Sequence, residues 1–294
     1  MRASKATTAM TSQQMPARNH SFYVDRHGCR ISGSVRGDGP PVLLIQGVGV
    51  HGDGWGPQVD RLAAQFRCLT FDNRGMGQSQ PVGAPLSIEL MAEDALALMD
   101  AQGWDSAHIV GHSMGGLIAQ QLALSARPRV RSLALLCTFS RGRDATRLSA
   151  WMLWVGLRTR LGTRRQRRHA FLKLVLPPSN LATADLDTLA ERFAPLFGHD
   201  LADQPPIAMK QLRAMSAYDS TSRLGELSGL PTLVVSAEHD RIARPELGRM
   251  IAAGVPGARY VEIPNASHGV PLEQSDSINS LLLEHLARAD SGLR

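Results

Sequence analysis

The chain has 294 residues, of which 43% are hydrophobic and 20% are charged, and its formal net charge is +6. This length and composition predict a globular enzyme with a sizeable core, built as one large domain or two ordinary ones. No run of about 18 apolar residues occurs, which excludes a membrane-spanning helix, and three widely spaced cysteines form neither a disulfide framework nor a metal cluster.

Residues 1–20 are rich in serine and threonine and contain no acidic residue. They lack the hydrophobic stretch of about 7–15 residues that a secretory signal needs. An organellar transit peptide has a similar composition, but this segment is short and shows little amphipathic periodicity. We therefore expect a flexible N-terminal tail. Sparse cysteines and the missing secretory signal together favour a reducing, cytoplasmic location.

From residue 21 onward, short apolar runs alternate with helical patterns. A hairpin is expected over 21–38, buried strands over 41–46, 68–71, 108–110 and 132–137, and helices over 57–66, 88–102 and 116–123. The alternation resumes after residue 222, with strands at 231–236 and 260–263 and helices from about 245 and 276. Such alternation predicts an α/β fold with a doubly wound, mostly parallel sheet and right-handed crossovers.

Residues 140–222 show helical patterns and several prolines but no buried strand. We predict a helical cap inserted after the sixth strand, which leaves 21–139 and 223–294 as the core. Trp151 and Trp154 could line a substrate pocket or belong to the core of the cap itself. Ten Arg and Lys but a single Asp lie between Arg141 and Lys173. This basic stretch could meet nucleic acid, an anionic membrane surface or an anionic or carrier-bound acyl substrate, or it could form a solvated helix face; no nucleic-acid-binding motif accompanies it.

A G-x-S-x-G pentapeptide, Gly111–Gly115, lies between the strand pattern at 108–110 and a helical pattern. A sharp strand-to-helix turn strains the serine and exposes its hydroxyl, and the flanking glycines allow strand and helix backbones to approach closely. The helix N-terminus presents unpaired N–H groups to whatever the serine attacks. The pentapeptide is short and also occurs in unrelated loops, but this setting makes Ser113 the candidate nucleophile.

A serine nucleophile needs a base, and the base needs an orienting carboxylate. In open α/β sheets such groups gather beyond the C-terminal ends of the strands. Asp240 follows one late strand by four residues, and His268 follows the next by five. Asp240 could instead cap a helix, and His268 could be a surface histidine. The chain order Ser113, Asp240, His268 nevertheless favours a catalytic triad.

An oxyanion hole also needs backbone donors, one after the nucleophile and one in a loop after an early strand. Met114 is expected to supply the first. The glycine-rich loop at 46–49 directly follows a buried strand, and the N–H of Val48 is expected to supply the second. The alternative for this loop is a plain glycine-rich turn.

These residues give the chain a resemblance to the α/β-hydrolase fold-1 superfamily, over about residues 21–286. The resemblance is carried by the pentapeptide with Gly116, by Asp240 with His268, and by the turn Asp72–Ser79, which follows the D-x-R-G-x-G-x-S pattern of that family. In the family this turn is a structural loop near the site. Gln46 stands where the early loop of the family usually has histidine, a change that affects loop geometry and substrate fit more than activity.

The resemblance and the residues together predict a serine hydrolase that cleaves a carboxylic ester or lactone, a small-molecule acyl substrate, through an acyl-enzyme. No cofactor, metal ion or nucleic-acid partner is expected, and the sequence does not indicate an oligomeric state. Alternatives with the same triad are thioesterase or acyltransferase activity and hydrolysis of a carbon–carbon bond. A cofactor-free perhydrolase and a non-catalytic ligand receptor on this fold are further alternatives.

Overall fold

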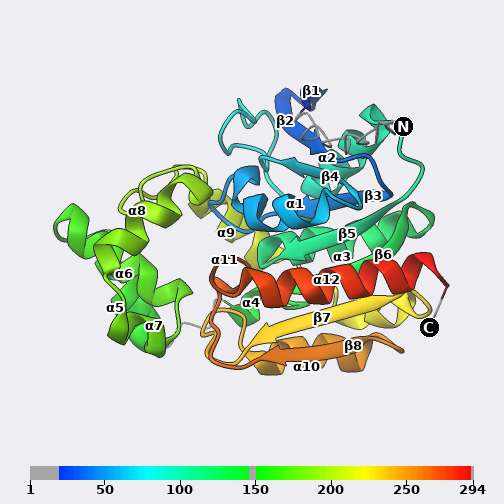
Figure 1. Ribbon diagram of the computed structural model, residues 1–294. Coiled ribbons are helices and arrows are strands. Elements are labelled where there is room, and N and C mark those ends of the chain that lie inside the picture. The colour runs from blue at the N-terminus through cyan, green and yellow to red at the C-terminus, as the bar shows by residue number, and fades with distance from the viewer. Residues whose placement is uncertain (1–19, 146–149, 293–294) are drawn as a thin grey trace, which may run out of the picture.

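A computed structural model describes residues 20–145 and 150–292. The predicted tail at 1–20 lies outside these residues except for His20, which begins the first strand. An eight-stranded sheet forms the centre of the fold, in the order β1-β2-β4-β3-β5-β6-β7-β8 (Figure 1). Among these strands, β1–β2 and β2–β4 pair antiparallel and the other neighbours pair parallel. The strands are β1 (His20–Arg26), β2 (Cys29–Arg36), β3 (Pro41–Ile45), β4 (Arg67–Phe71), β5 (Ala107–His112), β6 (Val130–Leu136), β7 (Thr232–Ala237) and β8 (Arg259–Ile263).

Helices cover both faces of the sheet, which confirms the predicted α/β class. The helices α1 (Gly56–Leu62), α11 (Val270–Glu273) and α12 (Ser275–Asp290) contact one another on one face. The helices α2 (Ile88–Ala101), α3 (Met114–Ser125) and α10 (Pro245–Gly254) lie on the opposite face. Short 3₁₀ segments precede α1, β6 and β7, namely η1 (Gly52–Trp55), η2 (Arg127–Arg129) and η3 (Thr221–Leu227).

The central parallel strands β3, β5, β6 and β7 are buried along nearly their whole length because helices cover them on both sides, whereas the edge strand β8 is mostly half-buried. In β3, β5 and β7 almost every side chain is buried, as the continuous apolar runs predict. The three cysteines are free thiols buried in this core. All parallel strands point their C-terminal ends towards the same edge of the molecule (Figure 1).

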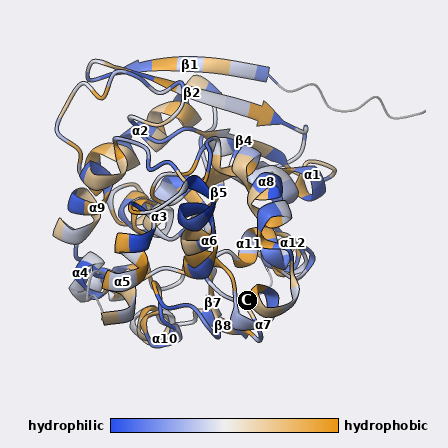
Figure 2. Ribbon diagram, turned by 90° about the vertical axis from the view of Figure 1, so that its left-hand side faces the viewer, coloured by the Kyte–Doolittle hydropathy of each residue, from blue (hydrophilic) through white to orange (hydrophobic). Residues whose placement is uncertain are grey.

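Between β6 and β7, the described residues form six helices over that edge. They are α4 (Gly142–Ala145), α5 (Ala150–Arg158), α6 (Arg164–Val175), α7 (Pro178–Thr183), α8 (Leu186–Phe197) and α9 (Ala208–Ala217). The two ends of this segment come together, because the N–H of Gly142 donates to Tyr218 and the N–H of Ser220 donates to Ser140. We call residues 140–222 the cap. Figure 2 looks onto this end of the molecule. No helix in the described ranges is both long and apolar enough to cross a membrane.

Candidate active site

Ser113 lies in the turn between β5 and α3, with a φ of 54° and a ψ of −121°. A positive φ is strained for a serine, and such strain persists only where the surrounding structure enforces it. A Cβ atom on Gly111 would lie 2.3 Å from the carbonyl oxygen of Gly115, and one on Gly115 would lie 2.1 Å from that of Ile45. The glycines of the pentapeptide are therefore required by the close approach of β5, α3 and β3.

The structure brings Ser113, His268 and Asp240 into one hydrogen-bonded chain. The hydroxyl of Ser113 lies 3.0 Å from Nε2 of His268, and Nδ1 of His268 lies 2.8 Å from Oδ2 of Asp240. Since a carboxylate only accepts, Nδ1 carries the hydrogen and Nε2 can accept the serine proton. All three residues are buried, and the acid and the histidine follow β7 and β8, as the strand ends predict.

The surroundings of Asp240 favour its ionised form. Burial alone would raise its pKa, but the facing His268 and the hydrogen bond between them outweigh that effect, and the pKa lies below its ordinary value. Its second oxygen accepts the N–H groups of Ile242 and Ala243 at 2.8 and 2.9 Å. An ionised carboxylate in this position fixes the tautomer of the imidazole and stabilises its protonated form.

His112, the residue before the nucleophile, also contacts the candidate base. Its Nε2–H donates to the carbonyl oxygen of His268 at 2.9 Å, and the two ring centroids lie 4.9 Å apart. Burial lowers the pKa of His112 to about 3, so its ring is neutral at physiological pH. The sequence analysis did not single out this residue; its position inside the pentapeptide was the available signal.

The loop after β3 approaches the nucleophile closely. A Cβ atom on Gly47 would lie 3.1 Å from the Cβ of Ser113. Two side chains hold the loop: Asn73 donates to the carbonyl oxygen of Gln46 at 2.9 Å, and Gln211 accepts the N–H of Gly49 at the same distance. The N–H of Val48 has no hydrogen-bond acceptor among the described residues. Met114 is the first residue of α3, where N–H groups lack an intrahelical partner.

A cavity of about 220 Å³ opens at Ser113. Its polar lining consists of Gln46, His112, Ser113, Gln204 and His268, and no Asp, Glu, Lys or Arg of the described chain lines it. The cap contributes apolar side chains from three helices: Phe171, Leu174 and Val175 of α6, Phe197 of α8, and Leu212 and Met215 of α9. The cavity is therefore small, apolar and uncharged apart from the reacting groups.

The cap and the loop that carries His268 are joined directly. The N–H of Gly269 donates to the carbonyl oxygen of Val175 at 2.8 Å, and Asn180 donates to the carboxylate of Glu273 at 3.1 Å. Burial raises the pKa of Glu273 to about 7. The position of His268, the candidate base, is therefore coupled to the position of the cap helices.

The sequence leaves two positions open for Trp151 and Trp154, a substrate pocket or the core of the cap. Trp151 and Trp154 are not among the residues that line the cavity at Ser113. The ring of Trp151 lies under Arg241, with 4.2 Å between guanidinium carbon and ring centroid, and Trp154 is more than half exposed. Apolar residues at helical spacing do not reveal which helix faces the cavity, and here α6 does so instead of α5.

Four arginines of the basic stretch pair with acids that come later in the chain. Arg164 contacts Asp200 and Asp203, and Arg165 contacts Asp187. Arg168 forms a two-point contact with Asp200, and these arginines lower the pKa of that carboxyl well below its ordinary value. None of these arginines lines the cavity. The interpretation of the stretch as an attractor of an anionic substrate therefore finds no support at the site.

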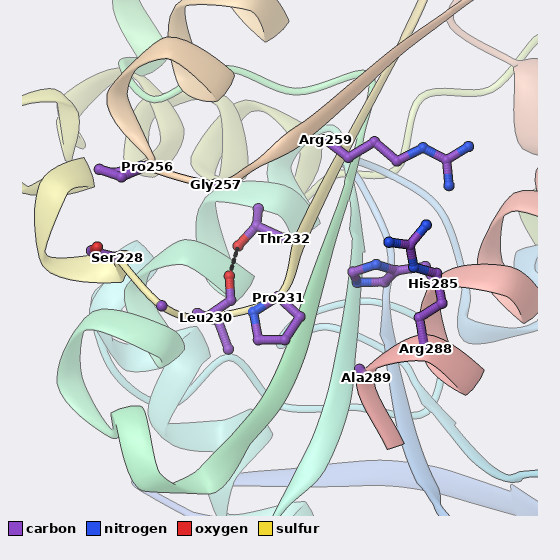
Figure 3. A pocket seen from close by; sticks show the side chains of 11 residues that line it. Ser228, Leu230, Pro231, Thr232, Pro256, Gly257, Arg259, His285, Arg288 and Ala289 are labelled. Carbon is purple, nitrogen blue, oxygen red and sulfur yellow. Dashed lines mark hydrogen bonds between the residues drawn. The ribbon is translucent and has the colours of Figure 1, made fainter. Parts of the chain in front are cut away.

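A larger hollow, of about 360 Å³, lies at the opposite ends of the strands (Figure 3). Arg259, Arg288 and His285 line one side of it, and the turn that leads into Thr232 lines another. Both arginines contact Glu284, at 2.8 and 3.7 Å. Its lining contains no hydrogen-bonded nucleophile and base, so its size does not make it the reactive site.

The chain was compared with families and with individual proteins. The model of the alpha/beta hydrolase fold family matches residues 40–275. A protein of Azorhizobium caulinodans named "Putative carbamate hydrolase RutD" is 30% identical over 256 residues, which cover 87% of this chain and 94% of that protein. The enol-lactonase of Burkholderia xenovorans LB400 is 27% identical, with a TM-score of 0.74 over 90% of this chain and 100% of that one.

A crystal structure of a hydrolase from Pseudomonas aeruginosa PA01 is also 27% identical, with a TM-score of 0.77 over 90% of this chain and 98% of that one. Both the family match and the similarity to individual relatives cover most of the chain. The chain therefore belongs to the alpha/beta hydrolase family and is a hydrolase.

Proposed function

We propose that this hydrolase cleaves a small, uncharged carboxylic ester or lactone, with Ser113 as nucleophile, His268 as base and Asp240 as its orienting acid. The observation that carries the proposal is the continuous chain from Ser113 Oγ through His268 to Asp240, which opens into a cavity. Strain at Ser113 and the bond from His112 to His268 support the same roles, because both hold reacting atoms in place.

The reaction follows from the placement of donors and acceptors. Ser113 attacks the carbonyl carbon while His268 Nε2 takes its proton, and the protonated ring then delivers that proton to the leaving oxygen. The N–H groups of Val48 and Met114 are proposed to hold the oxyanion, and loss of one such donor typically costs about 10²–10³-fold in rate. A water molecule, deprotonated by His268, then releases the acyl group.

The size and polarity of the cavity support a small substrate. A volume of about 220 Å³ lies below the range of roughly 300–1,000 Å³ usual for drug-sized ligands. A charged acyl group would enter a site without a compensating charge, and an unpaired buried charge is costly. Short esters and lactones fit these limits. One relative is named a carbamate hydrolase and another an enol-lactonase, so carbamates and enol lactones are also compounds to be tested.

Serine labelling tests the nucleophile, and a substrate panel tests the substrate class. A fluorophosphonate should add once to the protein, on Ser113 by peptide mass spectrometry, and the Ser113→Ala variant should not be labelled. Within the panel, acetyl and butyryl esters and small lactones should be cleaved much faster than dodecanoyl esters, succinate half-esters and thioesters. Labelling elsewhere, or none, would refute the serine mechanism. Labelling of Ser113 without turnover of any acyl compound would favour the ligand-receptor alternative.

A further inference from the structure

Exposed apolar side chains are concentrated on one segment of the cap. Seven large apolar side chains of the described chain are strongly exposed, and four of them lie within nine residues of each other. These four are Leu153, Trp154, Leu157 and Leu161, each exposed by 53–55%. Single exposed apolar residues are ordinary, whereas a cluster of them indicates an interaction surface. We call these four residues the α5 patch.

The α5 patch serves neither the core nor the cavity. Leu153, Trp154 and Leu157 share one face of α5, because residues three and four apart on a helix are neighbours. Val155 lies on the other face and is completely buried, and α5 packs against α6. The helix is therefore seated in the cap, with one face left uncovered. None of the four side chains lines the cavity at Ser113.

The cap also carries the positive charge of the folded chain. Residues 140–222 contain 13 Arg and Lys but seven Asp and Glu, which gives a net charge of +6, whereas 20–139 with 223–294 contain 16 and 19, a net charge of −3. Basic groups adjoin the patch: Lys173 Nζ lies 5.7 Å from the ring centroid of Trp154, and Arg158 lies on α5 itself. An anionic partner would meet this end first.

We propose that the α5 patch docks the cap onto an anionic lipid surface. Leucine and tryptophan side chains beside Arg and Lys are the composition of helices that lie in the membrane interface, where apolar groups insert and basic groups meet lipid phosphates. Three of its four residues lie on α5, in the part of the molecule farthest from the sheet (Figure 1), and Leu161 follows that helix, which suits a flat surface. A second copy of the chain fits less well, since two caps of net charge +6 repel each other.

Vesicle cosedimentation of the full chain tests this surface without reference to the reaction. Vesicles of phosphatidylglycerol and phosphatidylcholine in equal amounts should bind the chain at low salt, and vesicles of phosphatidylcholine alone should bind it at least tenfold more weakly. Salt at 0.5 M should weaken the binding, because it screens exposed charges. A variant with Leu153→Gln, Trp154→Gln and Leu157→Gln should lose at least tenfold in partitioning.

The matched control carries Tyr23→Gln and Met250→Gln, which remove exposed apolar side chains outside the cap. It should bind anionic vesicles like the unchanged chain. Residues 1–19 are the same in all these proteins, so a difference between them belongs to α5. Circular dichroism should show the same melting temperature for the three proteins. Unchanged vesicle binding by the α5 variant would overturn the proposal. It would also be overturned if the full chain did not bind anionic vesicles and used the patch to bind an acidic protein.

Discussion

Two Ser–His–Asp sets are seen in the part of the chain that the structure describes, at opposite ends of the parallel strands. Ser113, His268 and Asp240 lie at the C-terminal ends, beneath the cap. At the other end, His108 Nδ1 lies 2.8 Å from Ser132 Oγ and His108 Nε2 lies 3.0 Å from Asp290 Oδ1. The hydrogen-bond distances are alike, so distance alone does not separate a reactive set from a structural one.

The surroundings of the two serines differ. Ser132 lies within β6, without a positive φ and completely buried. Ser113 has a strained backbone, faces a cavity and precedes the N-terminus of α3. Asp290 is also shared with Arg131, at 2.5 Å. Access to a cavity, backbone strain and nearby amide donors therefore distinguish a candidate nucleophile from a serine that only forms a hydrogen bond with a buried imidazole.

The largest expected difference is between the two serines. Ser113→Ala should lower kcat for a short ester by about 10⁴–10⁶-fold, because no other group in the cavity can form the acyl-enzyme. Ser132→Ala should keep kcat within about twofold and lower stability by about 1 kcal/mol, the worth of one buried hydrogen bond. Initial rates and urea unfolding measure the two effects. Comparable activity losses in both variants would abolish the distinction.

Substitutions of Asp240 and Asp290 should likewise differ in their effect on kcat. Asp240→Asn leaves the geometry but not the charge, and an analogous change in serine proteases lowers kcat by about 10⁴-fold by favouring the wrong tautomer. Asp290→Asn should leave kcat unchanged, since His108 touches no reacting group. Steady-state rates per active site, counted by fluorophosphonate titration, provide the measurement. An Asp240→Asn variant with near-normal kcat would show that the acid lies elsewhere.

His112 extends the reactive set by one further contact. His112→Phe keeps an aromatic ring but removes the bond to the His268 carbonyl, and a small displacement of the base can cost about 10²-fold in kcat. His112→Gln retains a donor and should recover part of that loss. KM should change little in either variant. A role in stability alone would instead lower the melting temperature and leave the rate per titrated active site unchanged.

The candidate triad could be predicted from the sequence because it depends on local patterns. The strain at Ser113 follows from a pentapeptide between strand and helix, and the strand-end positions of Asp240 and His268 follow from parallel topology. The catalytic roles themselves stay predictions. The cap could not be derived in the same way, because Arg168 contacts an acid 32 residues away and the choice of α6 over α5 for the cavity is decided by tertiary packing. The set around His108 combines β5, β6 and the end of α12, and no sequence motif joins them.

The set of His108, Ser132 and Asp290 should affect the stability of the folded chain at acid pH. Burial lowers the pKa of His108 to about 4, so the folded chain resists protonation of a group that an unfolded chain protonates near pH 6.5. The contribution of this histidine is complete above pH 6.5 and is lost as the pH falls towards 4. His108→Gln removes the titrating group, so it should flatten the dependence of unfolding free energy on pH in this window by up to about 1.4 kcal/mol per pH unit. Ser132→Ala keeps the buried imidazole and should keep the slope, and an unaltered slope in His108→Gln would assign the acid sensitivity to other buried histidines.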